Sequence, residues 1–147
     1  MAGFMDLALA QARAAAEAGE VPVGAVLVDS AGNVLAAAHN RVERDKDPTA
    51  HAELLAIRAA CATRGDARLP DCDLYVTLEP CPMCATAISF ARLRRVYWGA
   101  SDPKGGGVEN GPRVFAQATC HHRPELIGGI AETESAALLR AFFRERR

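Results

Sequence analysis

The chain has 147 residues and a net charge of −1, and its composition is 50% hydrophobic and 24% charged. These values are typical of a soluble globular protein, and we expect residues 1–147 to form one domain. They exclude a disordered tail and a collagen-like fibre, and a general nucleic-acid-binding protein is usually more basic. Contact with a nucleic acid would therefore depend on a local patch of positive charge.

Two further features predict the cellular compartment. No apolar run approaches the roughly 20 residues that span a bilayer, and residues 1–11 lack the basic start of a signal peptide. We therefore expect a cytoplasmic protein with no membrane partner. Its five cysteines, an odd number, do not suggest a disulfide framework in that compartment, which favours metal binding or isolated thiols.

The N-terminal part of the chain predicts a helix followed by a hairpin. Met5–Ala18 is rich in alanine, with apolar residues at helical spacing, and Gly19 is a typical end. The apolar runs Val21–Val28 and Asn33–Ala38 flank turn residues at 29–32 and predict two paired strands.

The middle of the chain predicts alternating helices and strands. The polar segment Asn40–Pro48 predicts a loop, and Thr49–Thr63 predicts a helix. A short strand at Leu74–Leu78 is followed by Pro80, which is tolerated in a first helical turn. After it we expect a helix at about Cys81–Ala91 and a strand at Arg95–Trp98.

The last third begins with a long loop rich in glycine and polar residues, Gly99–Gly111. Beyond it we expect a short helix at Pro112–Ala118, a weak edge strand at Leu126–Ile130 and an amphipathic helix at Glu132–Arg146. Strands that alternate with helices predict an α/β fold in which helices cover the faces of a sheet.

Positive charge gathers at two places, Arg92 with Arg94 and Arg95, and Arg140 with Arg144, Arg146 and Arg147. Two interpretations are open. Each group is either a patch that holds phosphates or a solvated helix end, where arginine is favoured by the helix dipole.

The strongest chemical signal joins His51, Glu53, Cys81 and Cys84. Two thiols separated by two residues at a helix start can point to one spot, and the helix N-terminus favours their thiolate form. Zinc binds thiolates, and His51 supplies a third ligand. Because no second Cys-x-x-Cys completes four ligands, the metal would keep one open position, which is the catalytic arrangement.

An open zinc position lowers the pKa of a bound water from 15.7 towards about 7. Glu53, two residues after the histidine, is placed to take a proton from that water and pass it on. These parts suit the hydrolysis of a C–NH₂ bond on an electron-poor carbon, with loss of ammonia. Iron could occupy the same ligands, although two thiolates and an imidazole favour zinc.

Other histidines and cysteines lack partners at metal-binding spacing. We expect no ligand role for Cys61, Cys72, Cys120, His39, His121 or His122. A Cys-x-x-Cys alone is more often redox-active or structural than catalytic. The combination of His-x-Glu with Pro-Cys-x-x-Cys is far more specific.

Four segments resemble the cytidine-deaminase-like superfamily, and within it the bacterial tRNA-specific adenosine deaminases. They are Val21–Val28, Asp47–Glu53, Leu74–Cys81 and Ala136–Arg144, and the resemblance extends over nearly the whole chain. The motif His-x-Glu followed by Pro-Cys-x-x-Cys is the signature of zinc nucleobase deaminases.

The resemblance implies a three-layer α/β/α fold with a central mixed sheet of about five strands. It implies one Zn²⁺ per subunit, held by His51, Cys81 and Cys84, with Glu53 as the catalytic proton shuttle. The implied reaction converts wobble adenosine to inosine in a tRNA anticodon loop, through attack of the activated water on the ring carbon that carries the amino group. Family members are homodimers.

The resemblance also implies a set of substrate contacts. Asn40 would hydrogen-bond the target base, and backbone groups at Ala52 and Glu79 would line the pocket. Asp102 and Lys104 would meet the anticodon loop, and Phe143 with the trailing arginines would contact RNA.

The chain departs from the family pattern at Gly105–Gly111, and at Ser101, where a basic residue is frequent. These departures bear on the substrate more than on the chemistry. A deaminase of a free base or nucleoside, such as guanine or cytosine, is the alternative, and glycines 105–107 would give its closing loop room to move. A zinc-stabilised RNA-binding or scaffold domain is a third possibility, against which Glu53 argues.

Overall fold

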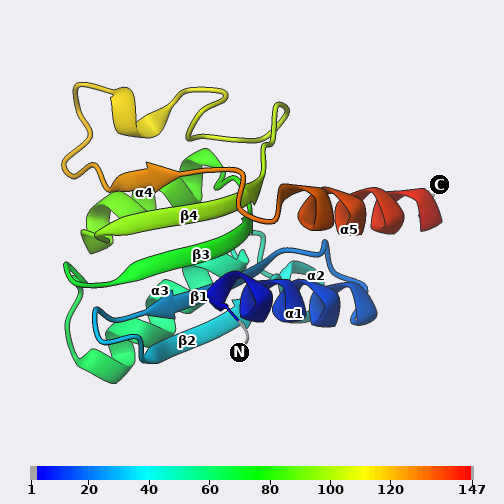
Figure 1. Ribbon diagram of the computed structural model, residues 1–147, viewed down its shortest axis with the longest axis horizontal. Helices are drawn as coiled ribbons and strands as arrows, with labels where there is room; N and C mark the ends of the chain where they lie inside the picture. Colours follow the sequence, from blue (N-terminus) through cyan, green and yellow to red (C-terminus); the bar gives the residue numbers. More distant parts are fainter. Residues whose placement is uncertain (1–2, 147) are drawn as a thin grey trace.

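The structure is a computed structural model that describes residues 3–146. Within them the chain folds into a sheet covered by helices on both faces (Figure 1). The elements are α1 (Phe4–Glu17), β1 (Gly24–Val28), β2 (Val34–His39), α2 (Val42–Asp45), α3 (Ala52–Arg64), β3 (Asp73–Leu78), α4 (Pro82–Ala91), β4 (Arg95–Ala100), the 3₁₀ turn η1 (Val114–Ala116), β5 (Glu125–Ile127) and α5 (Glu132–Glu145).

The strands form a mixed five-stranded sheet in the order β2-β1-β3-β4-β5. β1 pairs antiparallel with β2 and with β3, whereas β3, β4 and β5 run parallel. Helix α4 connects β3 to β4, as a parallel crossover requires. The predicted three-layer α/β/α fold with a mixed sheet of about five strands is confirmed.

Each face of the sheet has its own apolar core. Helices α3 and α4 cover one face, where Ala56, Ile57 and Ile88 pack on Leu74 and Val76. Helices α1 and α5 lie side by side on the other face (Figure 1), where buried residues of α1 and β1 are joined by partly buried side chains of β3, β4 and α5. Among residues 3–146, none of the helices is both long enough and apolar enough to cross a bilayer.

Most predicted elements are present, with shifted bounds. β1 begins at Gly24, because Pro22 has no N–H to give to a strand ladder. The predicted helix at 112–118 is reduced to η1, and the weak strand at 126–130 is the short edge strand β5.

The prediction of a loop throughout Asn40–Pro48 is wrong, because this segment contains the one-turn helix α2. The carboxylate of Glu20 accepts hydrogen bonds from the backbone N–H groups of Glu43 (3.0 Å) and Arg44 (2.8 Å). These N–H groups lie in the first turn of α2 and have no partner within the helix. A buried residue more than 20 positions earlier therefore stabilises this turn.

The topology gathers several chain segments at the carboxyl ends of β3 and β4. Leu78 and Ala100 are paired at this edge. Because β1 runs antiparallel to β3, the start of β1 lies at the same edge, as does Asn40, just after β2. Helices α3 and α4 also begin there. Ligands of open α/β sheets bind at the carboxyl ends of strands, so this edge is where a site is expected.

Candidate metal centre and active site

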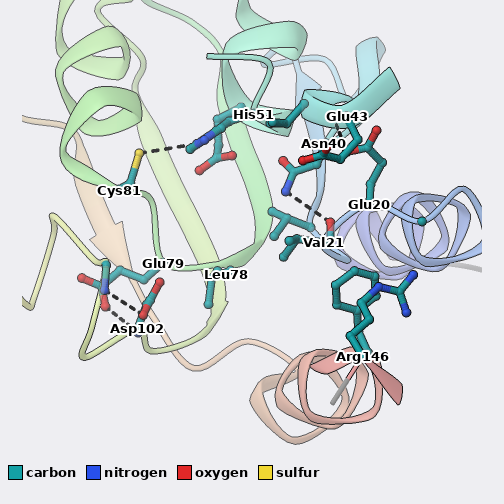
Figure 2. A pocket seen from close by; sticks show the side chains of 16 residues that line it. Glu20, Val21, Asn40, Glu43, His51, Leu78, Glu79, Cys81, Asp102 and Arg146 are labelled. Carbon is teal, nitrogen blue, oxygen red and sulfur yellow. Dashed lines mark hydrogen bonds between the residues drawn. The ribbon is translucent and has the colours of Figure 1, made fainter. Parts of the chain in front are cut away.

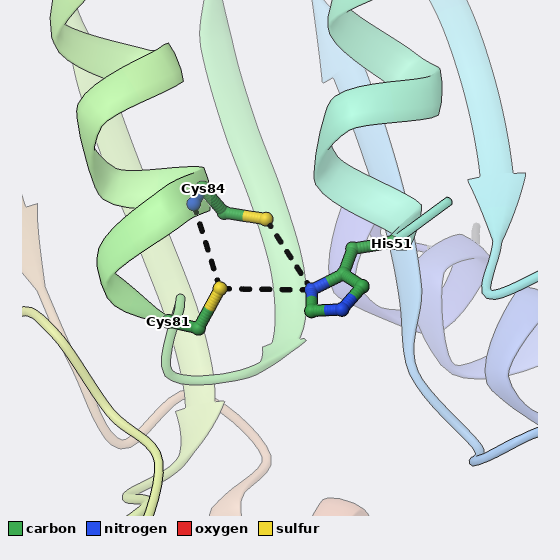
Figure 3. Close-up of side chains that lie close together, drawn as sticks. All are labelled: His51, Cys81 and Cys84. Carbon is green, nitrogen blue, oxygen red and sulfur yellow. Dashed lines mark hydrogen bonds between the residues drawn. The ribbon is translucent and has the colours of Figure 1, made fainter. Parts of the chain in front are cut away.

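The three predicted metal ligands lie together at the starts of two helices (Figure 3). His51 is the N-cap residue of α3, and Cys81 is the N-cap residue of α4. His51 Nδ1 lies 3.6 Å from Cys81 Sγ and 3.6 Å from Cys84 Sγ. Tetrahedral zinc, with Zn–S of about 2.3 Å and Zn–N of about 2.0–2.1 Å, sets nitrogen and sulfur about 3.6 Å apart. The donor set and its spacing fit one zinc ion with an open fourth position.

The helix start prepares Cys81 as a thiolate. The backbone N–H of Cys84 donates to Cys81 Sγ at 3.5 Å. Hydrogen bonding from Cys84 and from the ring of His51 lowers the pKa of Cys81 to about 4. The same contact with Cys81, together with burial, raises the pKa of Cys84. Thiolates are the form that binds zinc, so the N-terminus of α4 supplies a preformed anionic ligand.

Glu53 lies in the first turn of α3, two residues after the metal ligand His51. It is 4% exposed, and it lines the same cavity as His51 and Cys81. Burial raises the pKa of Glu53 to about 7. A carboxyl group that both takes up and releases a proton near neutral pH is suited to general acid–base work.

The ligands open into a cavity of about 580 Å³ (Figure 2). Its walls come from the segment between α1 and β1, the end of β3, the starts of α2 and α3, the loop after β4, and the end of α5. Figure 2 shows Arg146 of α5 across the cavity from His51 and Cys81. This volume lies within the range of about 300–1,000 Å³ that small-molecule sites occupy.

Asn40, predicted to contact the substrate, lines this cavity and is nearly buried. Its Oδ1 accepts the N–H of Ala52 at 2.9 Å, and its Nδ2 donates to the carbonyl oxygen of Val21 at 3.2 Å. The amide is thereby held in one orientation. An amide has two donor hydrogens and two acceptor lone pairs, so Asn40 keeps capacity for a ligand.

The backbone N–H groups of Ala52 and Glu79, two residues at which backbone groups are predicted to line the pocket, are engaged within the protein. The Ala52 N–H donates to Asn40, and the Glu79 N–H donates to the carbonyl oxygen of Ala100 at 2.8 Å. Ala52 is fully buried. Glu79 itself lines the cavity, and the substrate contacts predicted for backbone groups at Ala52 and Glu79 stay a prediction.

Comparisons with known proteins agree with this geometry. Residues 2–100 match the family described as the cytidine and deoxycytidylate deaminase zinc-binding region. The chain belongs to this deaminase family. The tRNA-specific adenosine deaminase of Agrobacterium fabrum is 61% identical over 144 residues, which cover 98% of this chain and 94% of the relative.

Two solved structures have a similar fold. One, from a study of A-to-I editing by tRNA:A34 deaminases at the wobble position, has a TM-score of 0.91 and 60% identity, and covers 92% of this chain and 98% of that one. Another, the guanine deaminase of Nitrosomonas europaea, has a TM-score of 0.76 and 25% identity, with 95% and 82% covered. The chain is therefore a zinc-dependent hydrolytic deaminase.

Beside the enzyme's cavity lies a second, wider hollow of about 990 Å³, which we call the outer groove. Its walls are the start of the loop after β4 and one face of α5: Ser101, Asp102, Lys104, Gly105, Leu139, Arg140, Phe143, Arg144 and Arg146, with Val21 and Leu78. Asp102, Gly105 and Arg146 also line the cavity that contains His51 and Cys81, so the two hollows adjoin.

The structure thus separates the predicted substrate residues into two groups. Asn40 and Asp102 line the inner cavity, whereas Lys104 and Phe143 line only the outer groove. The Asp102 carboxylate accepts the N–H groups of Lys104 (3.2 Å) and Gly105 (3.0 Å). Phe143 is 49% exposed, although it lies on a helix that packs on the sheet.

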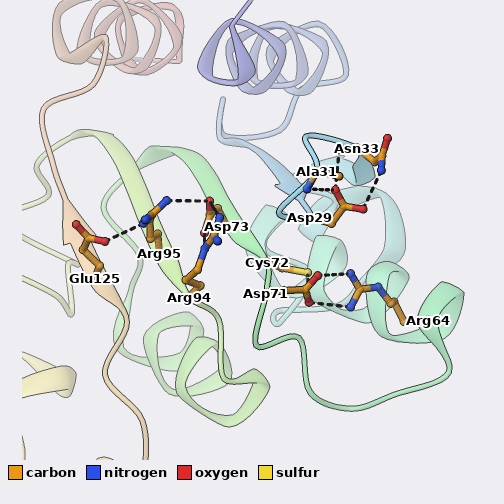
Figure 4. Close-up of polar contacts among 10 residues, drawn as sticks. All are labelled: Asp29, Ala31, Asn33, Arg64, Asp71, Cys72, Asp73, Arg94, Arg95 and Glu125. Atoms are coloured by element: carbon orange, nitrogen blue, oxygen red, sulfur yellow. Dashed lines mark hydrogen bonds and ion pairs between the residues drawn. The ribbon is translucent and has the colours of Figure 1, made fainter.

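The two arginine groups have different environments. Arg94 pairs with Asp73 at 2.8 Å, and Arg95 pairs with Glu125 at 2.8 Å (Figure 4). These two residues therefore make structural ion pairs at the start of β4, which neither the phosphate-patch nor the helix-end interpretation described. In contrast, Arg140 and Arg144 face the outer groove and make no ion pair with the described residues. Arg147 lies outside the described residues.

Sequence reasoning missed several groups of the cavity wall. Glu20, Val21 and Glu43 line the cavity, but only Val21 stood in a recognised motif, and there as part of a strand. Arg146 was predicted only as one of a basic cluster. Its guanidinium lies 3.8 Å from the ring centre of Phe142, in cation–π contact. No local pattern marks these residues, because the tertiary fold alone brings them together.

Proposed function

We propose that this chain deaminates the wobble adenosine of a tRNA anticodon loop to inosine. The observation that carries the proposal is the basic outer groove, which adjoins the cavity lined by His51, Glu53 and Cys81. An adenosine removed from the stack can enter the cavity while the flanking nucleotides follow the groove. The similarity to tRNA-specific adenosine deaminases supports the same substrate.

The proposed chemistry adds water to the purine and releases ammonia. Zinc, when bound to His51, Cys81 and Cys84, supplies a Lewis acid that activates water near neutral pH. The Glu53 carboxylate takes one proton from this water and delivers it to the ring nitrogen beside the reacting carbon. It then takes the second proton from the hydroxyl group added to that carbon and passes it to the departing amino group. Asn40 orients the base through its side-chain amide. Adenosine and water become inosine and ammonia.

The outer groove supplies the contacts to RNA in this proposal. Lys104, Arg140 and Arg144 hold phosphates, and the exposed ring of Phe143 offers a flat surface on which an unstacked base can lie. Single-stranded loops are the RNA targets whose bases can be splayed out in this way. Asp102 and Gly105 form the border between the groove and the cavity.

The cellular setting and assembly form the rest of the proposal. Residues 1–147 act as one deaminase domain in the cytoplasm, where tRNA is available, and two copies form a homodimer, as the family resemblance implies. Phe90 on α4, 62% exposed in the single chain, is a large apolar side chain that a second subunit can cover. Light scattering on the active enzyme measures the assembly, and an active monomer would contradict the homodimer.

Ammonia release measured on two substrate sets tests the proposed substrate. One set is an anticodon stem-loop with adenosine at the wobble position, and the other contains free guanine, cytosine, adenosine and cytidine. We expect turnover of the stem-loop alone. Turnover of free guanine alone would contradict the RNA substrate, keep the zinc chemistry, and agree with the similarity to a guanine deaminase.

A further inference from the structure

Glu79, two residues before the metal ligand Cys81, has a buried carboxylate that the proposed reaction does not use. Oε2 accepts the backbone N–H groups of three successive residues, Val108 (3.1 Å), Glu109 (3.0 Å) and Asn110 (3.0 Å). Oε1 accepts the Asp102 N–H at 2.9 Å and Asn110 Nδ2 at 2.6 Å. Successive N–H groups that converge on one oxygen form an anion-binding nest. Here the anion is a side chain of the protein itself.

The glycines of this loop allow the backbone to approach the carboxylate. A Cβ on Gly106 would lie 2.4 Å from Glu79 Oε2, and one on Gly107 would lie 2.5 Å from the nitrogen of Pro82. Both residues are buried, and the Gly107 N–H donates to the carbonyl oxygen of Pro80 at 2.8 Å. Gly106 and Gly107 therefore serve close packing and do not give the loop the room to move that was expected for glycines 105–107.

The fastened loop forms part of the border between the inner cavity and the outer groove. Asp102 and Gly105 line both hollows, and Lys104 lines the groove. Figure 2 shows Glu79 turned towards Asp102 and away from His51. The carboxylate thus joins the turn that carries Cys81 to the loop that borders the entrance, without touching the metal ligands.

We infer that Glu79 is a positioning residue that fixes the 102–110 loop as a rigid border of the substrate entrance and thereby sets the affinity for the RNA substrate. This inference rests on the proposed function for its substrate. The anchoring itself does not depend on which substrate is bound. Glutamine in place of Glu79 keeps one acceptor but turns an NH₂ group towards N–H donors, so part of the nest is lost.

The experiment compares Glu79→Gln with the wild-type enzyme in steady-state deamination of the anticodon stem-loop. Hydrogen bonds to a charged group are strong, so we expect KM to rise about tenfold or more. We expect kcat to stay within about threefold and the zinc content to remain one per chain, because Glu79 touches neither the ligands nor Glu53. Glu109→Gln is the matched control, since its exposed side chain lies in the same loop and only its backbone N–H reaches Glu79.

A second variant covers the case in which Glu79→Gln does not fold. Asn110→Ala removes the side-chain donor to Oε1 but keeps the backbone N–H, so we expect a smaller rise in KM in the same direction. Hydrogen exchange of the amides of 108–110, measured without substrate, is expected to be faster in both variants than in Glu109→Gln.

Three results would overturn the inference: an unchanged KM in both variants, a fall in kcat at unchanged KM, or exchange as slow as in wild type. Loss of zinc from Glu79→Gln would also overturn it, because the residue would then act on the metal centre. If the wild-type enzyme does not deaminate the stem-loop, the proposed function is wrong. The exchange measurement then still decides whether Glu79 anchors the loop, and KM is compared with the free base that the enzyme accepts.

Discussion

The two ends of the parallel strands β3 and β4 use charged side chains in different ways. At the carboxyl ends, Glu20, Glu53 and Glu79 are buried, and two of them hold backbone N–H groups of the cavity walls. At the amino ends, acids pair with partly exposed arginines: Arg64 with Asp71, Arg94 with the buried Asp73, and Arg95 with Glu125 (Figure 4).

This difference shows why one end carries the chemistry and the other does not. A buried carboxylate that is satisfied by fixed N–H groups keeps its charge and its position, so it can shape a site. A surface pair screens its own charge and contributes little beyond local stability. We therefore expect substitutions at the carboxyl ends to change catalysis strongly, and substitutions at the amino ends to change stability slightly.

The largest expected effect tests the chemical role of the carboxyl-end group Glu53. Glu53→Ala removes the proton-carrying group, so kcat should fall by about 10³-fold, within the usual range for general acid–base catalysis. Zinc content, measured by elemental analysis, should stay at one per chain, because the three ligands remain. Glu17→Gln changes an exposed glutamate of α1 and is the control. If the Glu53→Ala enzyme stayed active, Glu53 would not be the proton shuttle.

The next effect concerns the metal centre itself. Cys84→Ala leaves two of the three protein ligands, and zinc affinity should fall by more than the roughly 10- to 100-fold that follows loss of an outer-shell partner. Activity should fall in proportion to bound zinc. Cys61→Ala, which changes a partly exposed cysteine of α3, should keep both. Full zinc occupancy in Cys84→Ala would show that the three side chains are not one metal site.

A smaller effect is expected along the outer groove, where positive charge is not paired. Arg140→Ala combined with Arg144→Ala should lower kcat/KM for the anticodon stem-loop roughly tenfold at moderate salt. The slope of log kcat/KM against log salt should become shallower by about one for each phosphate contact that is lost. Arg13→Ala on α1, an exposed arginine far from the groove in sequence, is the control. If the double variant kept the wild-type salt slope, Arg140 and Arg144 would not contact RNA phosphates.

Some features of the site could be predicted from the sequence and others could not, and the difference depends on how far apart the contacting residues lie in the chain. The metal ligands and Glu53 were predictable, because each pair lies within one helix start and the chemistry of zinc restricts the choice. The environment of Glu79 was not, because its donors come 22 to 31 residues later. The ion pairs of Arg94 with Asp73 and of Arg95 with Glu125 could not be predicted either, since the two acids lie on neighbouring strands. Spacing within one helix start could thus be read from the sequence, whereas contacts that depend on register between distant segments could not.

The smallest expected effect lies at the amino ends, where Arg64 holds Asp71 through two hydrogen bonds of 2.8 and 2.7 Å. The Arg64 guanidinium lowers the pKa of Asp71 from 3.8 to about 2. Because the pKa in the folded state is depressed, this contribution to stability is complete above about pH 4 and is lost as the pH falls through 2. The Asp71 side chain is 38% exposed, so solvent screening reduces the contribution to about 0.5–1 kcal/mol. Asp71→Asn should lower the free energy of unfolding by this amount at pH 7, measured by urea denaturation, and the difference from wild type should vanish near pH 2. If this variant lost deaminase activity at pH 7, residues at the amino ends would also affect catalysis, which would contradict the comparison, because no contact of Asp71 reaches the cavity.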